Sequence, residues 1–424
     1  MLSLSVLRLR DFRLLLTTRA LGTMALQAQA VIVGWQVYSL TKDTFMLGLT
    51  GLTEAVPALI GALVAGHIVD ISRPYRVFLA CAGVLALNMS LLFLLAGGVV
   101  HVPGGNILPW IFSGVFLSGL ARSFIMPSSF VLLPQIVPRA QISSASAWLS
   151  GGFQIGIIAG PAIAGIIYGG YGSRVAWLLP MSLMVTEFLL ICAISSHHRN
   201  FRSMQKREPA VQSIKAGWRF IFKSRVLLSV MVLDMFAVLF GGAVAMLPAY
   251  ADQVLHVGSE GLGLLRSAPA IGAIISALIL ATRPMKHIHA SLLLWVVAAF
   301  GVCMIGFGVS TVFWLSLLFL AMSGVFDSVS MVIRATLTQL LTPESMRGRI
   351  SAVNSMFIIS SNEIGAFESG VAATLFGLVP SVILGGIGTL LVVGLTALLS
   401  PQLRRTVVNT EESANGQPHG AGDR

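Results

Sequence analysis

Long apolar stretches recur along the whole chain and are separated by short segments that hold most of its charged residues. Each stretch has about the 20 apolar residues that a helix needs to cross the hydrocarbon core of a bilayer. Regular alternation of apolar and polar residues is absent, which disfavours a membrane β-barrel. The pattern therefore predicts an all-α membrane protein with twelve transmembrane helices. The expected spans are 14–40, 45–69, 76–98, 108–133, 144–169 and 175–195 in the first half, and 226–250, 261–282, 290–309, 313–341, 351–376 and 380–400 in the second.

The composition agrees with this class of protein. Of the 424 residues, 56% are hydrophobic and only 10% are charged, and the mean hydropathy is +0.88. A sequence this apolar is not a series of soluble domains. The apolar run from Leu14 to Leu40 is too long for a cleaved signal peptide, so we expect it to remain as the first span.

The three cysteines each lie in an apolar stretch and show no metal-ligand spacing. They are Cys81, Cys192 and Cys303. Small apolar side chains of this kind usually serve packing. We therefore expect neither a metal site nor a cofactor.

The basic residues, which give the chain a formal net charge of +11, are regularly placed. They recur before the first span and after every even-numbered span, whereas the alternate loops hold few. By the positive-inside rule, this placement predicts an even number of spans and two cytoplasmic termini in a multi-pass protein of the cytoplasmic (inner) membrane. The charge is thus explained by topology, and we expect no nucleic-acid binding.

One long polar segment separates the two sets of spans. Its second part places apolar residues such as Trp218 and Phe222 on one helical side and Lys215 and Arg219 on the other, which suits a short helix on the membrane surface. We therefore divide the chain into an N-terminal six-helix bundle (1–195), a cytoplasmic linker (196–225), a C-terminal six-helix bundle (226–405) and a tail (406–424) that is expected to be disordered.

The two halves resemble each other in sequence. The segments SGLARSFIMPSSFVLLPQIVP, from Ser118, and SGVFDSVSMVIRATLTQLLTP, from Ser323, align without a gap. The matched pairs are Gly119 with Gly324, Arg122 with Asp327, Met126 with Met331 and Pro138 with Pro343. Such a repeat predicts two pseudo-symmetric bundles, with a substrate site near the membrane midplane where the bundles meet.

The loop after the second span carries a family signature. The segment GHIVDISRPYR resembles the cytoplasmic signature of the major facilitator superfamily, with Gly66, Asp70, Arg73 and Arg76 at the matching positions. The resemblance implies that these four residues form a gate at the cytoplasmic mouth, with the arginines also near lipid phosphates. The sequence departs from the signature where Ile71 replaces a basic residue and Pro74 replaces a glycine.

The fifth predicted span, GIIAGPAIAG, resembles the signature of the exporter branch of that superfamily. Gly156, Gly160 and Gly165 would clear one face for close helix packing, and Pro161 removes a backbone hydrogen bond and allows bending. The second glycine of the usual terminal pair is Ile166 here, so the match is incomplete.

The second half looks like the enterobactin-exporter-like branch, also called the transmembrane secretion effector group, of the twelve-span drug/proton antiporters. The segments that carry this resemblance are SVSMVIRATLTQL, TPESMRGRISAVNSMF and SNEIGAFESG, and it extends over nearly the whole chain. It implies export of siderophores or other amphipathic small molecules from the cytoplasm, driven by proton influx. We expect the chain to act as a monomer.

Charged residues inside the predicted spans are costly in hydrocarbon and normally face a water-filled path or a partner. Asp327 and Glu363 lie roughly 20 Å from the cytoplasmic ends of their spans, and Arg334 roughly 10 Å. Arg122 is the repeat partner of Asp327, and Glu54 lies about ten residues into span two, near the same level. We predict that these five residues line the translocation path and take part in proton coupling.

A structural network is the alternative interpretation of these charges. Asp327, Arg334 and Glu363 would then hold span ten against span eleven. Glu368 lies outside the midplane layer, and we place it in the path nearer the external mouth.

We expect other charges to have simpler roles. Glu187 belongs to span six, where packing or snorkelling would explain it. Asp234, Asp252 and Arg266 lie toward the ends of their predicted spans, where water is easily reached.

The first predicted span is unusually polar and aromatic for a helix that faces lipid. Its candidate substrate-contact residues are Gln27, Gln29, Trp35, Gln36 and Tyr38. Hydrogen bonding between helices is the alternative explanation.

The sequence therefore predicts a proton-coupled exporter, with a small-molecule substrate, protons and membrane lipids as its partners. A facilitator or importer of the same fold is the first alternative, and a transport-inactive receptor or scaffold the second. No nucleophile elbow, phosphate-binding loop or metal-ligand cluster indicates an enzyme.

Overall fold

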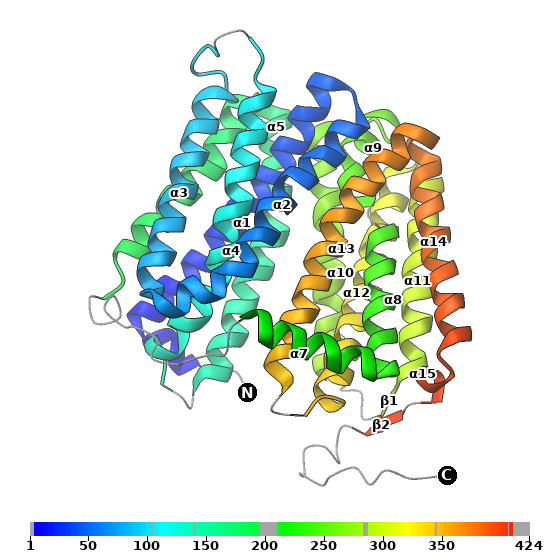
Figure 1. Cartoon of the computed structure of the whole chain (residues 1–424). Helices are drawn as coiled ribbons and strands as arrows, with labels where there is room; N and C mark the ends of the chain where they lie inside the picture. The colour runs from blue at the N-terminus through cyan, green and yellow to red at the C-terminus, as the bar shows by residue number, and fades with distance from the viewer. Residues whose placement is uncertain are drawn as a thin grey trace.

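A computed structural model describes residues 4–102, 105–138, 141–195, 210–241, 243–282, 287–343, 346–405 and 407–409. The chain is a bundle of long helices (Figure 1). The α-helices are α1 (Arg10–Thr41), α2 (Thr44–Ile71), α3 (Pro74–Leu95), α4 (Leu108–Ile136), α5 (Ile142–Cys192), α7 (Ala210–Lys223), α8 (Arg225–Phe240), α9 (Leu247–Gln253), α10 (Gly258–Thr282), α11 (Ala290–Val309), α12 (Phe313–Leu340), α13 (Arg347–Phe376), α14 (Leu378–Leu399) and α15 (Pro401–Arg405). Short 3-10 helices are η1 (Leu4–Arg8) and η3 (Ala243–Met246), and the strands are β1 (His287–His289) and β2 (Val407–Asn409).

The all-α membrane fold predicted from the sequence is confirmed. Nine helical segments in the described residues are long and apolar enough to cross a membrane. One of them, Ile142–Cys192, holds a kink at Gly172, whose φ of 77° breaks the helix between the predicted fifth and sixth spans. The number of twelve spans stays a prediction.

Local sequence signals set several helix boundaries. The Asp43 carboxylate accepts a hydrogen bond from the Phe45 N–H at 2.8 Å and so caps α2. Pro74 starts α3, where its missing N–H costs nothing. The predicted span 226–250 is interrupted, because α8 ends at Phe240 and η3 precedes the short α9.

Equivalent helices pair in the two halves. α2 packs on α4 in the first half, and α10 packs on α12 in the second; α1 with α5 corresponds to α8 with α13. Gly119 of α4 lies against the backbone of Glu54, and its repeat partner Gly324 of α12 lies against the backbone of Pro269. The aligned glycines therefore make the same close crossing twice.

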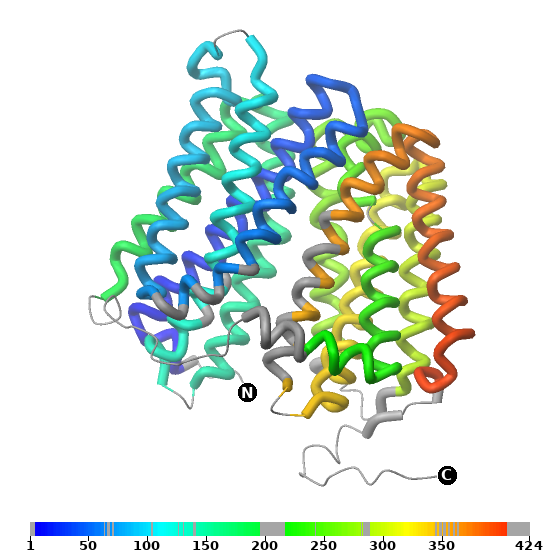
Figure 2. The backbone as a smooth tube through the Cα atoms, in the orientation of Figure 1, coloured from blue at the N-terminus to red at the C-terminus, as the bar shows by residue number. Residues whose placement is uncertain are grey.

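In the described residues, the most extensive packing between the halves is that of α2 with α13 and of α5 with α10. At each crossing glycine meets glycine: Gly48 faces Gly370, and Gly165 faces Gly263. Figure 2 shows the two sets of helices converging toward the end of the bundle that lies opposite α7. We call the end that holds α7 the linker end and the other the opposite end.

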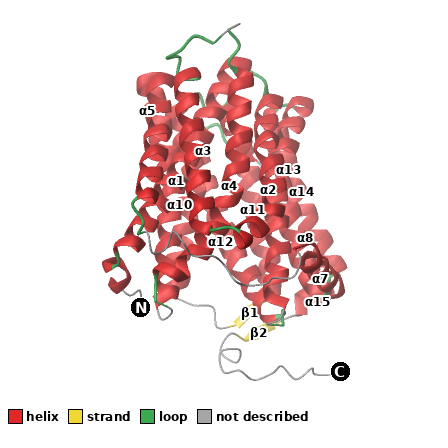
Figure 3. Ribbon diagram, turned by 60° about the vertical axis from the view of Figure 1, so that its left-hand side comes forward, coloured by secondary structure: helices red, strands yellow, loops and turns green. Residues whose placement is uncertain are grey.

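The linker end carries the amphipathic helix predicted from the sequence (Figure 3). In α7, the Trp218 ring lies 5.4 Å from that of Phe222 and 5.1 Å from that of Phe357 in α13, while Ile221 is fully buried. The earlier part of the linker, 196–209, lies outside the described residues. Within the tail expected to be disordered, residues 407–409 instead form β2, because their backbone pairs with β1; residues 406 and 410–424 lie outside the described residues.

Candidate functional site

A cavity of about 380 Å³ lies between the two halves. Helices of both halves line it, and most of its wall is apolar. The charged side chains in that lining are Glu54, Arg122, Arg266 and Asp327. An enclosure that combines apolar walls with a few charged groups is typical of a site for a small organic molecule.

The N-terminal half contributes an ion pair to the cavity. The Arg122 Nη1 atom lies 2.7 Å from Glu54 Oε1, and the two side chains are 37% and 26% exposed. The pair joins α4 to α2 at the crossing where Gly119 allows the helix backbones to approach. Arg122 and Glu54 were predicted to share one level, and the structure brings them into direct contact.

The C-terminal half contributes Asp327, whose side chain is 49% exposed in the cavity lining. Behind it, Arg334 lies with Nη2 3.8 Å from Asp327 Oδ1 and forms a second ion pair with Asp234 of α8. Arg334 and Asp234 are mostly buried, with side chains 14% and 9% exposed. One arginine is therefore shared between a carboxylate at the cavity and a carboxylate inside the bundle.

The two remaining predicted path residues, Glu363 and Glu368, are not among the residues that line the cavity in the described part of the chain. The side chain of Glu363 lies outside the described residues, although its neighbour Asn362 lines the cavity. Glu368 lies outside the cavity lining, toward the opposite end of α13 and next to the crossing of Gly370 with Gly48.

The polar residues of α1 divide into two groups. Gln27 and Gln29 line the cavity, and the Gln29 amide also exchanges hydrogen bonds with Ser118 at 3.1 Å. Gln36 instead joins helices, because its Nε2 donates to the Ala96 carbonyl and its Oε1 accepts from Trp177, both at 2.8 Å.

Trp35 and Tyr38 also lie outside the cavity lining. Trp35 packs against the central apolar core, and Tyr38 is 1% exposed and accepts a hydrogen bond from Gln253. For these residues the structure favours the alternative of contacts between helices.

Two cavity-related residues were missed by the sequence reasoning. Asp234 and Arg266 were expected near span ends, but Asp234 is 7% exposed and paired with Arg334, and Arg266 lines the cavity. Asp234 lies nine residues after Arg225, where α8 begins, which corresponds to roughly 13 Å of helix. Counting from the Ser224 cap would have placed it well inside the bundle.

The family-like motifs also have defined positions. Gly156 and Gly160 lie against α1, near Thr23 and Met24, whereas Gly165 lies against Ser259 and Gly263 of α10. The carbonyl of Pro161 faces Gly263 as well.

The predicted gate lies at the linker end. Gly66 falls near the end of α2, and Arg73 and Arg76 lie at the start of α3. The side chain of Asp70 lies outside the described residues.

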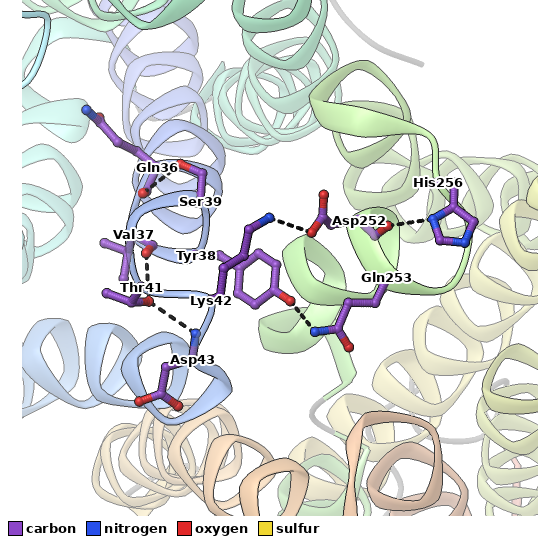
Figure 4. A network of polar contacts seen from close by, with 10 residues as sticks. All are labelled: Gln36, Val37, Tyr38, Ser39, Thr41, Lys42, Asp43, Asp252, Gln253 and His256. Carbon is purple, nitrogen blue, oxygen red and sulfur yellow. Dashed lines mark hydrogen bonds and ion pairs between the residues drawn. The ribbon is translucent and has the colours of Figure 1, made fainter.

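A polar network joins the two halves at the opposite end, which we expect it to help close (Figure 4). Lys42 Nζ lies 2.7 Å from Asp252 Oδ2, and Gln253 donates to the Tyr38 hydroxyl at 2.5 Å. Lys42 has a φ of 52°, a left-handed conformation that a non-glycine residue seldom adopts. This conformation ends α1 where its last side chains meet α9.

The Lys42 pair should contribute modestly to this closure. The measurement is labelling of a cysteine placed at Gln27 by a membrane-impermeant reagent that is added at the opposite end. Replacing Asp252 with alanine is expected to raise this labelling by less than about fivefold, because exposed ion pairs are worth at most about 1 kcal/mol. The matched control is D43N, because asparagine caps a helix as well as aspartate does. A much larger increase would contradict this estimate.

This closure should also be insensitive to pH near neutrality. The hydrogen bond to Asp252 raises the pKa of Lys42 above its ordinary value. The pair therefore keeps its charge at neutral pH, and on the basic side its attraction is lost as the pH rises through that raised pKa. Labelling should be constant between about pH 6 and pH 9.

The family model described as Major Facilitator Superfamily matches residues 15–366. The enterobactin exporter EntS of Citrobacter koseri is 26% identical over 408 residues, which cover 96% of this chain and 95% of that protein.

Solved structures show the same fold at low sequence identity. A variant of the peptide transporter POT with bound sulfate has a TM-score of 0.73 at 13% identity, over 93% of this chain and 95% of that one. A variant of the nucleoside transporter NupG has a TM-score of 0.71 at 12% identity, over 92% of this chain and 99% of that one.

Proposed function

This chain belongs to the Major Facilitator Superfamily and is a multi-pass membrane transporter, and from that premise we propose that it exports a siderophore or another amphipathic small molecule in exchange for protons. The observation that carries the proposal is the cavity between the halves, which holds an ion pair on one wall and a carboxylate that shares an arginine on the other. The likeness to an enterobactin exporter supports the substrate class, and the glycine pattern of α5 supports export.

The arrangement suggests how alternating access would work. The basic residues place the linker end in the cytoplasm by the positive-inside rule. With the opposite end closed by the glycine crossings and the Lys42 pair, substrate enters from the cytoplasm and binds in the cavity. Rocking of the halves then opens the opposite end while Asp70, Arg73 and Arg76 close the cytoplasmic mouth.

Proton coupling requires a group for which proton and substrate compete. We assign that role to Asp327, with Glu363 as its predicted neighbour. When Asp327 takes up a proton, its attraction to Arg334 is lost, and Arg334 stays with Asp234. A charged or polar substrate group competes in the same way for Asp327, or for Arg122 by displacing Glu54.

The test uses proteoliposomes with an imposed proton gradient and a panel of siderophores and cationic amphipaths. Wild type is expected to move at least one class against its gradient, and D327N and E363Q are expected to abolish this movement while the protein stays folded. D43N is the matched control, because it changes the same chemical group at an end of α2 outside the cavity. Full transport by both D327N and E363Q would refute the coupling role, and gradient-independent equilibration unaffected by either would indicate a facilitator.

A further inference from the structure

Glu187 is a buried carboxylate of the N-terminal half that the proposed mechanism does not use. It lies in the part of α5 that follows the kink at Gly172, it is 2% exposed, and its Oε2 atom has no hydrogen-bond partner among the described residues. It is absent from the cavity lining. The side chain does not reach water, so snorkelling, one of the roles expected from the sequence, does not explain it.

The carboxyl group occupies a place made by a glycine. A Cβ atom at Gly22 of α1 would lie 2.5 Å from Glu187 Oε1 and 2.6 Å from Oε2, closer than real Cβ contacts. The two oxygens therefore lie directly against the α1 backbone, and any side chain at position 22 would displace them. The absence of a side chain at Gly22 provides the space that the carboxyl group occupies.

The charged neighbour of this carboxyl is Arg19, which lies one helical turn before Gly22 and interacts with Glu187 electrostatically. The Arg19 guanidinium also stacks on the ring of Phe153, at 4.6 Å from its centroid. Arg19 thus has two partners, the carboxylate and the aromatic ring.

The other helices packed around Glu187 add few charged groups. In α3, residues 77–95 hold no Asp, Glu, Lys or Arg, and their titratable group is Cys81. The start of α3 adds Arg76 and Tyr75, whose hydroxyl donates to the Ile191 carbonyl one turn after Glu187. In the first part of α5, residues 142–171 also hold none, and their titratable groups are Tyr168 and Tyr171. An ionised carboxylate with an unpartnered buried oxygen is costly, whereas the protonated acid is neutral. The surroundings therefore suit a group that changes its protonation state.

We propose that Glu187 binds and releases a proton during the transport cycle, at a site separate from the central cavity. The proposal rests on the proton-coupled function proposed above. The proton is exchanged with water that reaches the contact of α1 with α5 when the halves rock. Its release leaves a carboxylate that attracts Arg19, and its uptake leaves Arg19 on Phe153. The effect reaches the cavity through α1, because Gln27 and Gln29 follow Gly22 by five and seven residues, or roughly 8–10 Å of helix.

The position of α1 makes it suitable for this relay. On one side it contacts Glu187 through Gly22, and on another it contacts Gly156 and Gly160 of the exporter-like motif. A change in charge at position 187 therefore acts on a helix that is closely packed and that also contributes to the cavity.

The first test compares wild type with E187Q, which keeps the shape of the side chain and removes its proton chemistry. Gradient-driven substrate movement is expected to be lost in E187Q, while substrate exchange at equal pH on both sides and substrate affinity are kept. E260Q, in α10 and outside the cavity lining, is the matched control and should behave as wild type. Retained gradient-driven movement in E187Q, or an equal loss of coupled movement and exchange, would overturn the proposal.

The second test observes the proton directly and does not require transport. Infrared difference spectra of the wild-type protein in lipid, recorded on changing pH, should contain a protonated-carboxyl band that is absent in E187Q and present but displaced in E187D. A band that is unchanged in E187Q would overturn the site. Because this measurement needs no substrate, it separates failure of the Glu187 site from failure of the proposed export function.

Discussion

Replacing Arg334 with leucine is expected to destabilise the folded chain by about 3–5 kcal/mol, because it removes one partner of a buried charge pair. The Asp234 side chain is 9% exposed and pairs with Arg334, so R334L would leave a carboxylate inside the bundle without its counter-charge. Thermal unfolding in detergent, followed by loss of the monodisperse protein, measures the change. Asp327 would lose the same partner, so transport should fail as well.

Two further variants separate charge from geometry. R334K keeps a positive charge but not the planar fork that serves two carboxylates, so it should be less destabilised than R334L. The double variant D234N/R334L removes both members of the buried pair and should recover much of the lost stability, because the uncompensated charge at position 234 is gone and Asp327 is half exposed in the cavity lining. Wild-type stability in R334L would show that the pair carries little energy.

Much of the fold could be predicted because membrane insertion imposes a simple pattern. Apolar length identified the helices, and the aligned pair Gly119 and Gly324 indicated the repeat that the structure shows as two equivalent crossings. Helical depth for Asp327, and its alignment with Arg122 in the repeat, predicted that both residues lie at one level, and both line the same cavity.

Side-chain direction and partners were much harder to predict. Helical depth says nothing about which way a residue faces, so Gln36 was grouped with Gln27 although it bonds to Trp177. Asp234 was misplaced although the predicted start of its span, residue 226, is one residue from Arg225, because a position roughly two turns into the helix was still treated as near its end. The Glu187 site required a contact between helices far apart in sequence, and Gly22 gives no sign of it when read alone.

Bulky residues at the glycine crossings are expected to abolish transport by preventing closure of the opposite end. A Cβ atom at Gly370 would lie 2.7 Å from the Gly48 Cα atom, and one at Gly165 would lie 2.4 Å from the Ser259 carbonyl oxygen. Both obstacles are backbone, which cannot move aside as a side chain can. G370L and G165L should therefore hold the two halves apart at this end.

Cysteine cross-linking measures this closure directly. The hydroxyl oxygens of Thr44 and Thr374 lie 3.1 Å apart across the same crossing, so cysteines at both positions should form a disulfide when the native cysteines have been replaced. The bond should form in the otherwise unchanged chain and fail in G370L. G151L is the matched control for G165L, because Gly151 lies in the same helix with no heavy atom near the position of its Cβ. Efficient cross-linking with normal transport in both crossing variants would show that the halves can close without this close approach. Loss of cross-linking together with retained folding would show that glycine at these two crossings is what permits the closed state.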